Sequence, residues 1–380
     1  MTKFDYTKLL EDRRISAGVK VENMVVVHLG LRRASQTTIP AELPSGVEMG
    51  AAIDDSMRPR LETLKGIQDP RRRIATIEVL KKEMSKAFEG VVESSPEYKA
   101  LMGWAERLGL RVNQVEVRPT IHEVYQYRDR DALKELQGLM RERGKLREKV
   151  RRSPSPLRGR MQLAYPEEFE GDWIRRMGRL LGYPECCTDR YIADRMNGVS
   201  VEHRASGQLK EAGVVDPHVY FVGHFFPCLP TCENALAKGR LYQETLAKVD
   251  ERLGAVYEVV TRENLETVRR QPEIIAEFLS RTGSIAPRVP GLPILPEWYL
   301  PLLHGDAFDL EDHGALRVRA AEVLDLVNIV PGLRDLPLHR RCERHYGAEG
   351  CQADTVSLLK HQPPRIARDP VTDPVDLART

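Results

Sequence analysis

Four of the six cysteines in this 380-residue chain lie in two short segments that also contain prolines. The first segment is GYPECC, Gly182 to Cys187, and the second is HFFPCLPTC, His224 to Cys232. Six cysteines are too few for a disulfide scaffold in a chain of this length. Cys186 and Cys187 are neighbours, so their Cα atoms are about 3.8 Å apart, below the range of ordinary disulfides. The two groups therefore predict a metal site, with buried free thiols as the alternative.

Both cysteine groups stand at the predicted start of a helix. Pro184 suits a first helical turn, which places Cys186 and Cys187 among free backbone N–H groups. Thr231 is a predicted N-cap, which places Cys232 in the same situation on a second helix. Helix N-termini favour thiolates and stabilise the negative charge of four thiolates around a metal. The predicted ligands are Cys186, Cys187, Cys228 and Cys232.

The spacing of the cysteines also bears on the kind of metal. Adjacent side chains diverge by about 100° on a helix, which suits a larger cluster better than one tetrahedral ion. Pro227-Cys228 is a context found at iron–sulfur sites. We therefore expect an iron–sulfur cluster, used for electron transfer or to hold a substrate if the protein is an enzyme. The alternative is a binding module with structural zinc that contacts nucleic acid or a protein partner. His224, four positions before Cys228, is expected to replace one ligand or to support one.

A third group of metal-binding residue types lies near the C-terminus, in RRCERHYGAEGC. Cys342, His345 and Cys351 are candidates for a second metal site, with His339 and Glu343 nearby. A fourth ligand is not evident, so chance proximity is the favoured interpretation. The sequence contains no Gly-rich phosphate loop, Gly-x-Ser-x-Gly elbow or His-Glu-x-x-His motif, so these motifs support no enzyme class.

The two cysteine segments resemble a known family. LLGYPECCTDRYI followed by HFFPCLPTCENA is similar to an uncharacterised prokaryotic family, best represented in archaea. Its pattern is Gly-Tyr-Pro-x-Cys-Cys and then His-x-Pro-Cys-x-x-x-Cys; here two phenylalanines separate His224 from Pro227. The resemblance covers about residues 95 to 260. It implies a cysteine site made by the same four cysteines and implies no particular reaction.

The length of the chain predicts more than one domain, at roughly 100 to 200 residues for each. The expected fold class is α+β: an N-terminal α/β unit, a mainly helical domain with the cysteines, and a small C-terminal mixed segment. The predicted parts are residues 1–155, residues 156–284, a Pro-rich crossing with a mixed segment over residues 285–362, and a disordered tail over residues 363–380.

Secondary structure in the first part follows from short signals. The β-branched run Val19 to Leu31 predicts one or two buried strands, followed by a loop to about Gly50. Apolar residues at helical spacing predict a helix from Arg71 to Phe88. Ser95 as N-cap and Gly109 as the closing residue bound the next helix.

After that helix, two strands and a further helix are expected. The strands are Leu110 to Val117 and Ile121 to Tyr127, and Asp129 is a predicted cap for the helix that follows. In the second part the expected helices are Asp172 to Leu181, Pro184 to about Asn197, and a long one from Cys232 to about Arg262.

Charge and hydropathy limit the remaining function classes. Lys and Arg number 58 and Asp and Glu 56, a net charge of +2, which is not that of a strongly polyanion-seeking protein. No apolar run is long enough to span a bilayer, and the N-terminus lacks signal-peptide features, so we expect a cytoplasmic protein. Arg141 to Arg160 holds nine basic and two acidic residues. We interpret it first as a solvated helix end running into a linker, and second as a weak, non-specific nucleic-acid contact.

Overall fold

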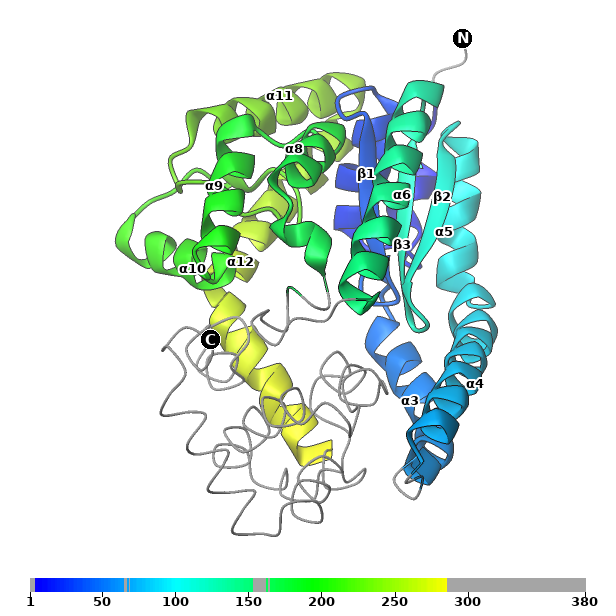
Figure 1. Cartoon of the computed structure of the whole chain (residues 1–380). Helices are drawn as coiled ribbons and strands as arrows, with labels where there is room; N and C mark the ends of the chain where they lie inside the picture. The colour runs from blue at the N-terminus through cyan, green and yellow to red at the C-terminus, as the bar shows by residue number, and fades with distance from the viewer. Residues whose placement is uncertain (1–3, 65–66, 68, 153–161, 163–164, 286–380) are drawn as a thin grey trace.

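The computed structural model describes residues 4–64, 67, 69–152, 162 and 165–285. Over these residues the chain has the predicted α+β fold, with one three-stranded sheet among many helices (Figure 1). The predicted C-terminal segments and the group Cys342, His345 and Cys351 lie outside the described residues. In chain order the main elements are α1 (Thr7–Glu11), η1 (Val19–Val25), α2 (Val26–His28), β1 (Ala34–Ile39), α3 (Gly46–Thr63), α4 (Pro70–Phe88), η3 (Glu89–Glu93), α5 (Pro96–Arg107), β2 (Arg111–Arg118), β3 (Ile121–Tyr127), α6 (Arg130–Arg152), η4 (Pro166–Phe169), α8 (Gly171–Leu180), α9 (Glu185–Met196), α10 (Val201–Glu211), η5 (Pro217–Tyr220), α11 (Glu233–Val249) and α12 (Glu251–Ile285).

The sheet has the strand order β1-β3-β2, and both pairs are antiparallel. Successive residues of a strand point to opposite faces, so the central strand β3 contributes to two cores. Val124 joins the larger hydrophobic cluster, and Tyr125 and Tyr127 join the smaller one with α6 and α8. The sheet therefore connects the helices of the cysteine region to the N-terminal helices.

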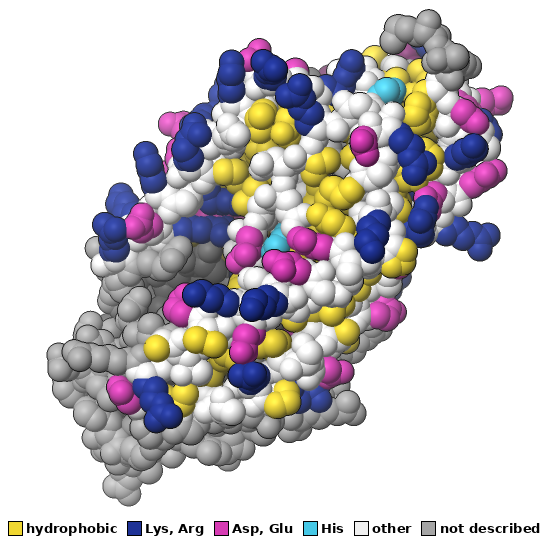
Figure 2. Space-filling view, turned by 90° about the vertical axis from the view of Figure 1, so that its right-hand side faces the viewer, with side chains coloured by type: hydrophobic (Ala, Val, Ile, Leu, Met, Phe, Trp, Pro, Cys, Tyr) yellow, Lys and Arg dark blue, Asp and Glu magenta, His cyan; other side chains and the backbone are white. Residues whose placement is uncertain are grey.

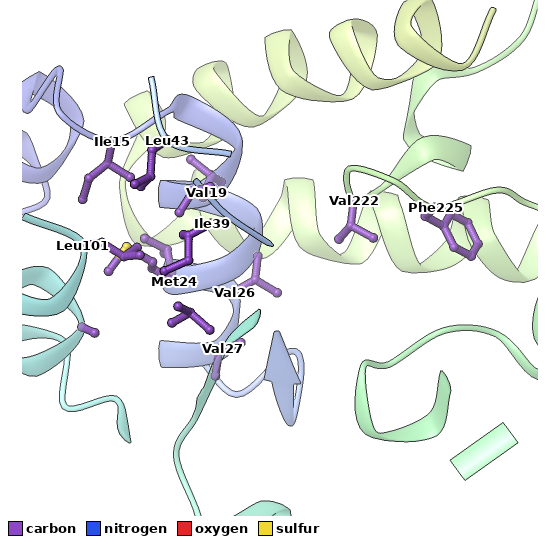
Figure 3. Close-up of a cluster of buried hydrophobic side chains, with 14 of the residues drawn as sticks. Ile15, Val19, Met24, Val26, Val27, Ile39, Leu43, Leu101, Val222 and Phe225 are labelled. Atoms are coloured by element: carbon purple, nitrogen blue, oxygen red, sulfur yellow. The ribbon is translucent and has the colours of Figure 1, made fainter. Parts of the chain in front are cut away.

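The larger core draws on residues from Tyr6 to Val268. Figure 3 shows part of it, where Val19 and Met24 of η1 lie beside Ile39 at the end of β1. Because this core contains residues from both sides of position 155, the N-terminal region and the cysteine region pack against each other. The predicted domain boundaries stay a prediction.

Three capping signals of the N-terminal region, at Ser95, Gly109 and Asp129, are confirmed. The Ser95 hydroxyl accepts a hydrogen bond from the Tyr98 N–H at 3.1 Å, and Gly109 has a φ of 67° after α5. The Asp129 carboxylate accepts from the Ala132 N–H at 2.6 Å at the start of α6. The predicted strands match β2 and β3, and the predicted helix from Arg71 matches α4.

The prediction of strands from Val19 to Leu31 is wrong. This run forms the π-helical segment η1 and the short helix α2, and the first strand is β1, which lies in the predicted loop. A fully buried helix and a buried strand both read as continuous apolar runs, so periodicity does not separate them. The polar residues within η1 have specific partners; for example, the Asn23 amide donates to the Thr37 hydroxyl at 3.0 Å.

Two later predictions are also corrected. The single helix expected from Cys232 is two helices, because Asp250 is extended (φ −156°, ψ 123°) and its carboxylate accepts from the Arg252 N–H. Helix α10 lies between the predicted helices, where no helix was predicted, although Ser200 accepts from the His203 N–H as an N-cap. Helix α3 was not predicted either.

The described surface mixes side chains of all types. On the face shown in Figure 2, acidic side chains lie among basic ones, with apolar side chains between them. None of the described helices combines the length and apolarity needed to cross a membrane.

Candidate metal centre

The structure brings the four predicted cysteines together. Their sulfur atoms all lie within 4.8 Å of one another. The Cys186 Sγ is 3.9 Å from the Cys187 Sγ and 3.7 Å from the Cys232 Sγ, and the last two sulfurs are 3.6 Å apart. Cys187 and Cys232 are buried, and Cys186 and Cys228 are half-buried. We call these four residues the cysteine quartet, a group that has the chemistry and the spacing to hold a metal.

Two helix N-termini meet at the quartet. Pro184 is the N-cap of α9, so Cys186 and Cys187 lie in its first turn. Cys232 is itself the N-cap of α11, one position after the predicted Thr231. The Asn234 amide, also in the first turn of α11, donates to the Cys186 sulfur at 3.4 Å. The positive ends of both helices therefore face the sulfurs and favour their thiolate form.

Close packing of α8 and α9 positions the first cysteine pair. A Cβ at Gly178 of α8 would lie 2.7 Å from the Thr188 hydroxyl, so only glycine permits this approach. The turn between the helices contains Gly182, whose φ of 76° is a conformation that favours glycine. These two glycines set the direction of α9 and so the place of Cys186 and Cys187.

Helix α10 positions Cys228. The Arg204 guanidinium donates to the Pro227 carbonyl at 2.7 Å and to the Asp194 carboxylate of α9 at 2.8 Å. Both side chains of this ion pair are almost fully buried. The Cys228 N–H in turn donates to the Cys187 sulfur at 3.4 Å. The loop before α11 is therefore held against α9 by protein contacts alone, and the quartet is preorganised.

Burial governs the acidity of the thiols. It raises the pKa of Cys228 to about 11 and the pKa of Cys187 still further. Burial also acts against ionisation of Cys186, but hydrogen bonds from Asn234 and the neighbouring thiols outweigh it and lower its pKa. Four thiolates at this spacing repel one another, so full ionisation of the quartet requires a cation at its centre.

His224 is not part of the quartet. Its side chain is exposed, and its backbone is in the left-handed region with a φ of 57°. It lines a cavity that shares Cys187 with the quartet and is formed by residues of both the N-terminal region and the cysteine region. The only group of metal-binding side chains found among the described residues is the quartet, without His224.

Several polar residues of that cavity were not predicted. Glu22, Arg32, Glu42 and Tyr183 come from separate segments and meet at the cavity wall. The one available signal was Glu22, an acid inside the apolar run VKVENMVVV. A charged residue in such a run is rarely buried without a specific role.

The predicted basic segment is only partly a free surface. The Arg143 guanidinium is buried against the Glu123 carboxylate at 2.6 Å, and Arg147 is paired with Glu167. Lys145 and Lys149 of the same helix are exposed. Weak nucleic-acid contact through this segment stays a prediction.

A family described as a protein of unknown function (DUF483) matches residues 149–255. This span contains α8 to α11 and the whole quartet, and it agrees with the resemblance to an uncharacterised family. No curated protein and no solved structure matches the chain.

Proposed function

We propose that the chain is a metal-binding protein in which the cysteine quartet holds one metal centre. The observation that carries the proposal is the mutual distance of the sulfurs, all within 4.8 Å. Two converging helix N-termini offset the charge that four thiolates leave around a divalent ion. Binding would release the thiol protons, since the ligand is the thiolate.

The sulfur distances favour a single tetrahedral ion. Zinc–sulfur bonds of about 2.3 Å define a tetrahedron with edges of about 3.8 Å. The three distances among Cys186, Cys187 and Cys232 are 3.6 to 3.9 Å. In an iron–sulfur cubane each thiolate binds a different iron, which holds the sulfurs farther apart. Adjacent cysteines were expected to suit a cluster better than one tetrahedral ion. The distance of 3.9 Å between the Cys186 and Cys187 sulfurs weakens that expectation, because it matches one edge of such a tetrahedron.

We therefore place zinc first and an iron–sulfur cluster second. Four protein ligands complete the tetrahedron and leave no open position for a substrate, which is the pattern of structural zinc. The site would then join α9, the loop before α11 and the start of α11. Cys187 and Cys228 are 41 positions apart in the chain, so a metal between them closes a long loop.

The test is the metal content of the full chain purified without oxygen. We expect about one zinc per chain and a colourless protein. A brown protein that contains iron and acid-labile sulfide would indicate that the same site holds an iron–sulfur cluster and not zinc. Protein that holds neither metal after incubation with zinc or with iron and sulfide would refute the proposal.

Serine variants assign the ligands. Cys187→Ser and Cys228→Ser should each remove the metal. Cys351→Ser is the matched control, because it makes the same substitution outside the quartet. Loss of an equal amount of metal in Cys351→Ser would indicate that the C-terminal group supplies a ligand.

A further inference from the structure

A cavity of about 700 Å³ opens beside the quartet. Its wall combines residues of η1 and β1 with residues of α8, α9 and the loop Gly223–Phe226. Cavities of this size are typical of sites for small organic molecules. Its charged residues indicate which kind of molecule it accepts.

Most arginines of the wall are neutralised by the protein itself. Arg143 pairs with Glu123 at 2.6 Å, and Arg195 pairs with Glu168 at 2.9 Å. Arg147 approaches both carboxylate oxygens of Glu167. These three guanidiniums are therefore already paired with carboxylates of the protein. They do not form a free cluster that could bind a phosphate or a carboxylate.

Three carboxyl groups of the wall, those of Glu22, Glu42 and Glu202, form no such ion pair within the described part of the chain, and Glu22 and Glu42 lie near each other. Glu22 accepts hydrogen bonds from the Gly223 N–H at 2.8 Å and the Asn264 amide at 2.6 Å, and Glu42 accepts one from the Thr38 N–H at 2.6 Å. Neither forms an ion pair with Lys or Arg among the described residues. Arg32 lies near both.

Arg32 does not compensate for two carboxylates. Its guanidinium donates to the Leu181 carbonyl at 2.9 Å and to the Glu22 carbonyl at 3.0 Å. Arg32 is thus shared between the two carboxyl groups and His224 lies near Glu42 alone, and burial raises the pKa of both Glu22 and Glu42. A positively charged ligand would supply the missing compensation.

The same part of the wall is aromatic. The rings of Tyr183 and Phe225 lie 5.2 Å apart between their centroids, and Phe226 lines the cavity as well. Aromatic faces attract cations that have lost part of their water. The left-handed backbone of His224 places this residue at the same wall, and such strained positions cluster at functional sites.

We propose that the cavity binds a small organic cation, an amine or an amidine, whose charged head lies at Glu22 and Glu42 and whose body packs on Tyr183. The site is separate from the metal centre, although the two share the wall formed by Cys187. The proposal does not require the metal to take part in binding.

Three probes of nearly the same shape test the sign of the charge. Benzamidine is a cation, benzamide is neutral and benzoate is an anion. Each is titrated by calorimetry into the full chain, with the metal content measured in the same sample. We expect benzamidine to bind at least about tenfold more tightly than benzamide, and benzoate to bind most weakly.

Matched variants locate the binding. Glu42→Gln and Glu22→Gln each replace one carboxyl group by an amide of nearly the same size. The titrations are made at pH 9, because burial raises the pKa of Glu22 to about 8 and its carboxyl group is ionised only above that pH. Each variant should then weaken benzamidine binding at least about tenfold. Glu106→Gln, an exposed residue of α5, makes the same change of charge and should have no effect.

The outcomes separate the cavity from the metal centre. Equal affinity for benzamidine and benzamide, tighter binding of benzoate, or no binding of benzamidine at millimolar concentration would overturn the proposal. Unchanged benzamidine affinity in Glu42→Gln would overturn it as well. Each of these results leaves the metal content, and so the proposed metal centre, unaffected.

Discussion

The protonation of Glu22 gives the most direct test of the structure. Its side chain is 3% exposed, within the π-helical segment η1. Burial raises its pKa from 4.5 to about 8, and the hydrogen bonds from Gly223 and Asn264 and the nearby charge of Arg32 offset only part of this effect. In the folded protein Glu22 is therefore mostly protonated at neutral pH.

The raised pKa links stability to pH. An acid whose pKa is higher in the folded state stabilises that state below its unfolded pKa, and this contribution is lost as pH rises through the folded pKa. With about 1.36 kcal/mol for each pH unit, a pKa of about 8 in the folded state against 4.5 in the unfolded state gives a loss of about 4 kcal/mol between pH 5 and pH 9. This is a large part of the usual free energy of unfolding, about 5 to 15 kcal/mol.

Glu22→Gln isolates the effect, because glutamine resembles the protonated acid and does not titrate. We expect urea unfolding at pH 5, 7 and 9 to show that the wild-type protein loses about 4 kcal/mol more than the variant over this range. Contributions from other titrating groups cancel in the difference. Glu106→Gln should keep the wild-type dependence. Parallel curves for the wild-type protein and Glu22→Gln would refute the reasoning and would mean that Glu22 is ionised when folded.

Further predictions concern the metal, the packing and the surface. Cys187→Ser should lower metal affinity by more than about 100-fold, measured by competition with a chelator. Gly239→Ala should cost about 3 kcal/mol in urea unfolding, because its Cβ would lie 2.0 Å from the His218 carbonyl oxygen; Gly207→Ala, in open space on α10, should instead stabilise by up to about 1 kcal/mol. Nucleic-acid binding measured by anisotropy should be weak, fall steeply with salt and disappear on charge reversal of Lys145 and Lys149.

Local signals made part of the fold predictable. Ser95 and Gly109 bound α5 because a cap acts within one turn of its own residue, and the β-branched and aromatic residues of Ile121–Tyr127 favour a strand in the same local way. The cysteine quartet was predictable for a related reason. Proline-flanked cysteines in two groups have few roles other than binding a metal, even before their spatial arrangement is known.

Other features depend on contacts that sequence spacing does not encode. The run from Val19 is helical because it is surrounded by other elements, and its apolar residues would be buried in a strand as well. The cavity wall joins Glu22, Glu42, Tyr183 and His224 from separate parts of the chain. No periodic pattern relates these positions, so only the tertiary structure reveals their shared site.

The loop from Gly223 to Cys228 connects the cavity to the metal centre. At one end the Gly223 N–H donates to Glu22 in the cavity wall, and at the other end the Cys228 N–H donates to the Cys187 sulfur. Between them His224 adopts a left-handed backbone, which costs on the order of 1 kcal/mol for a residue with a side chain. Binding of a structural zinc contributes roughly ten times as much. A metal in the quartet would therefore add to the contacts of Arg204 and Cys228 that already hold this loop, and it would further stabilise the cavity wall without taking part in any reaction.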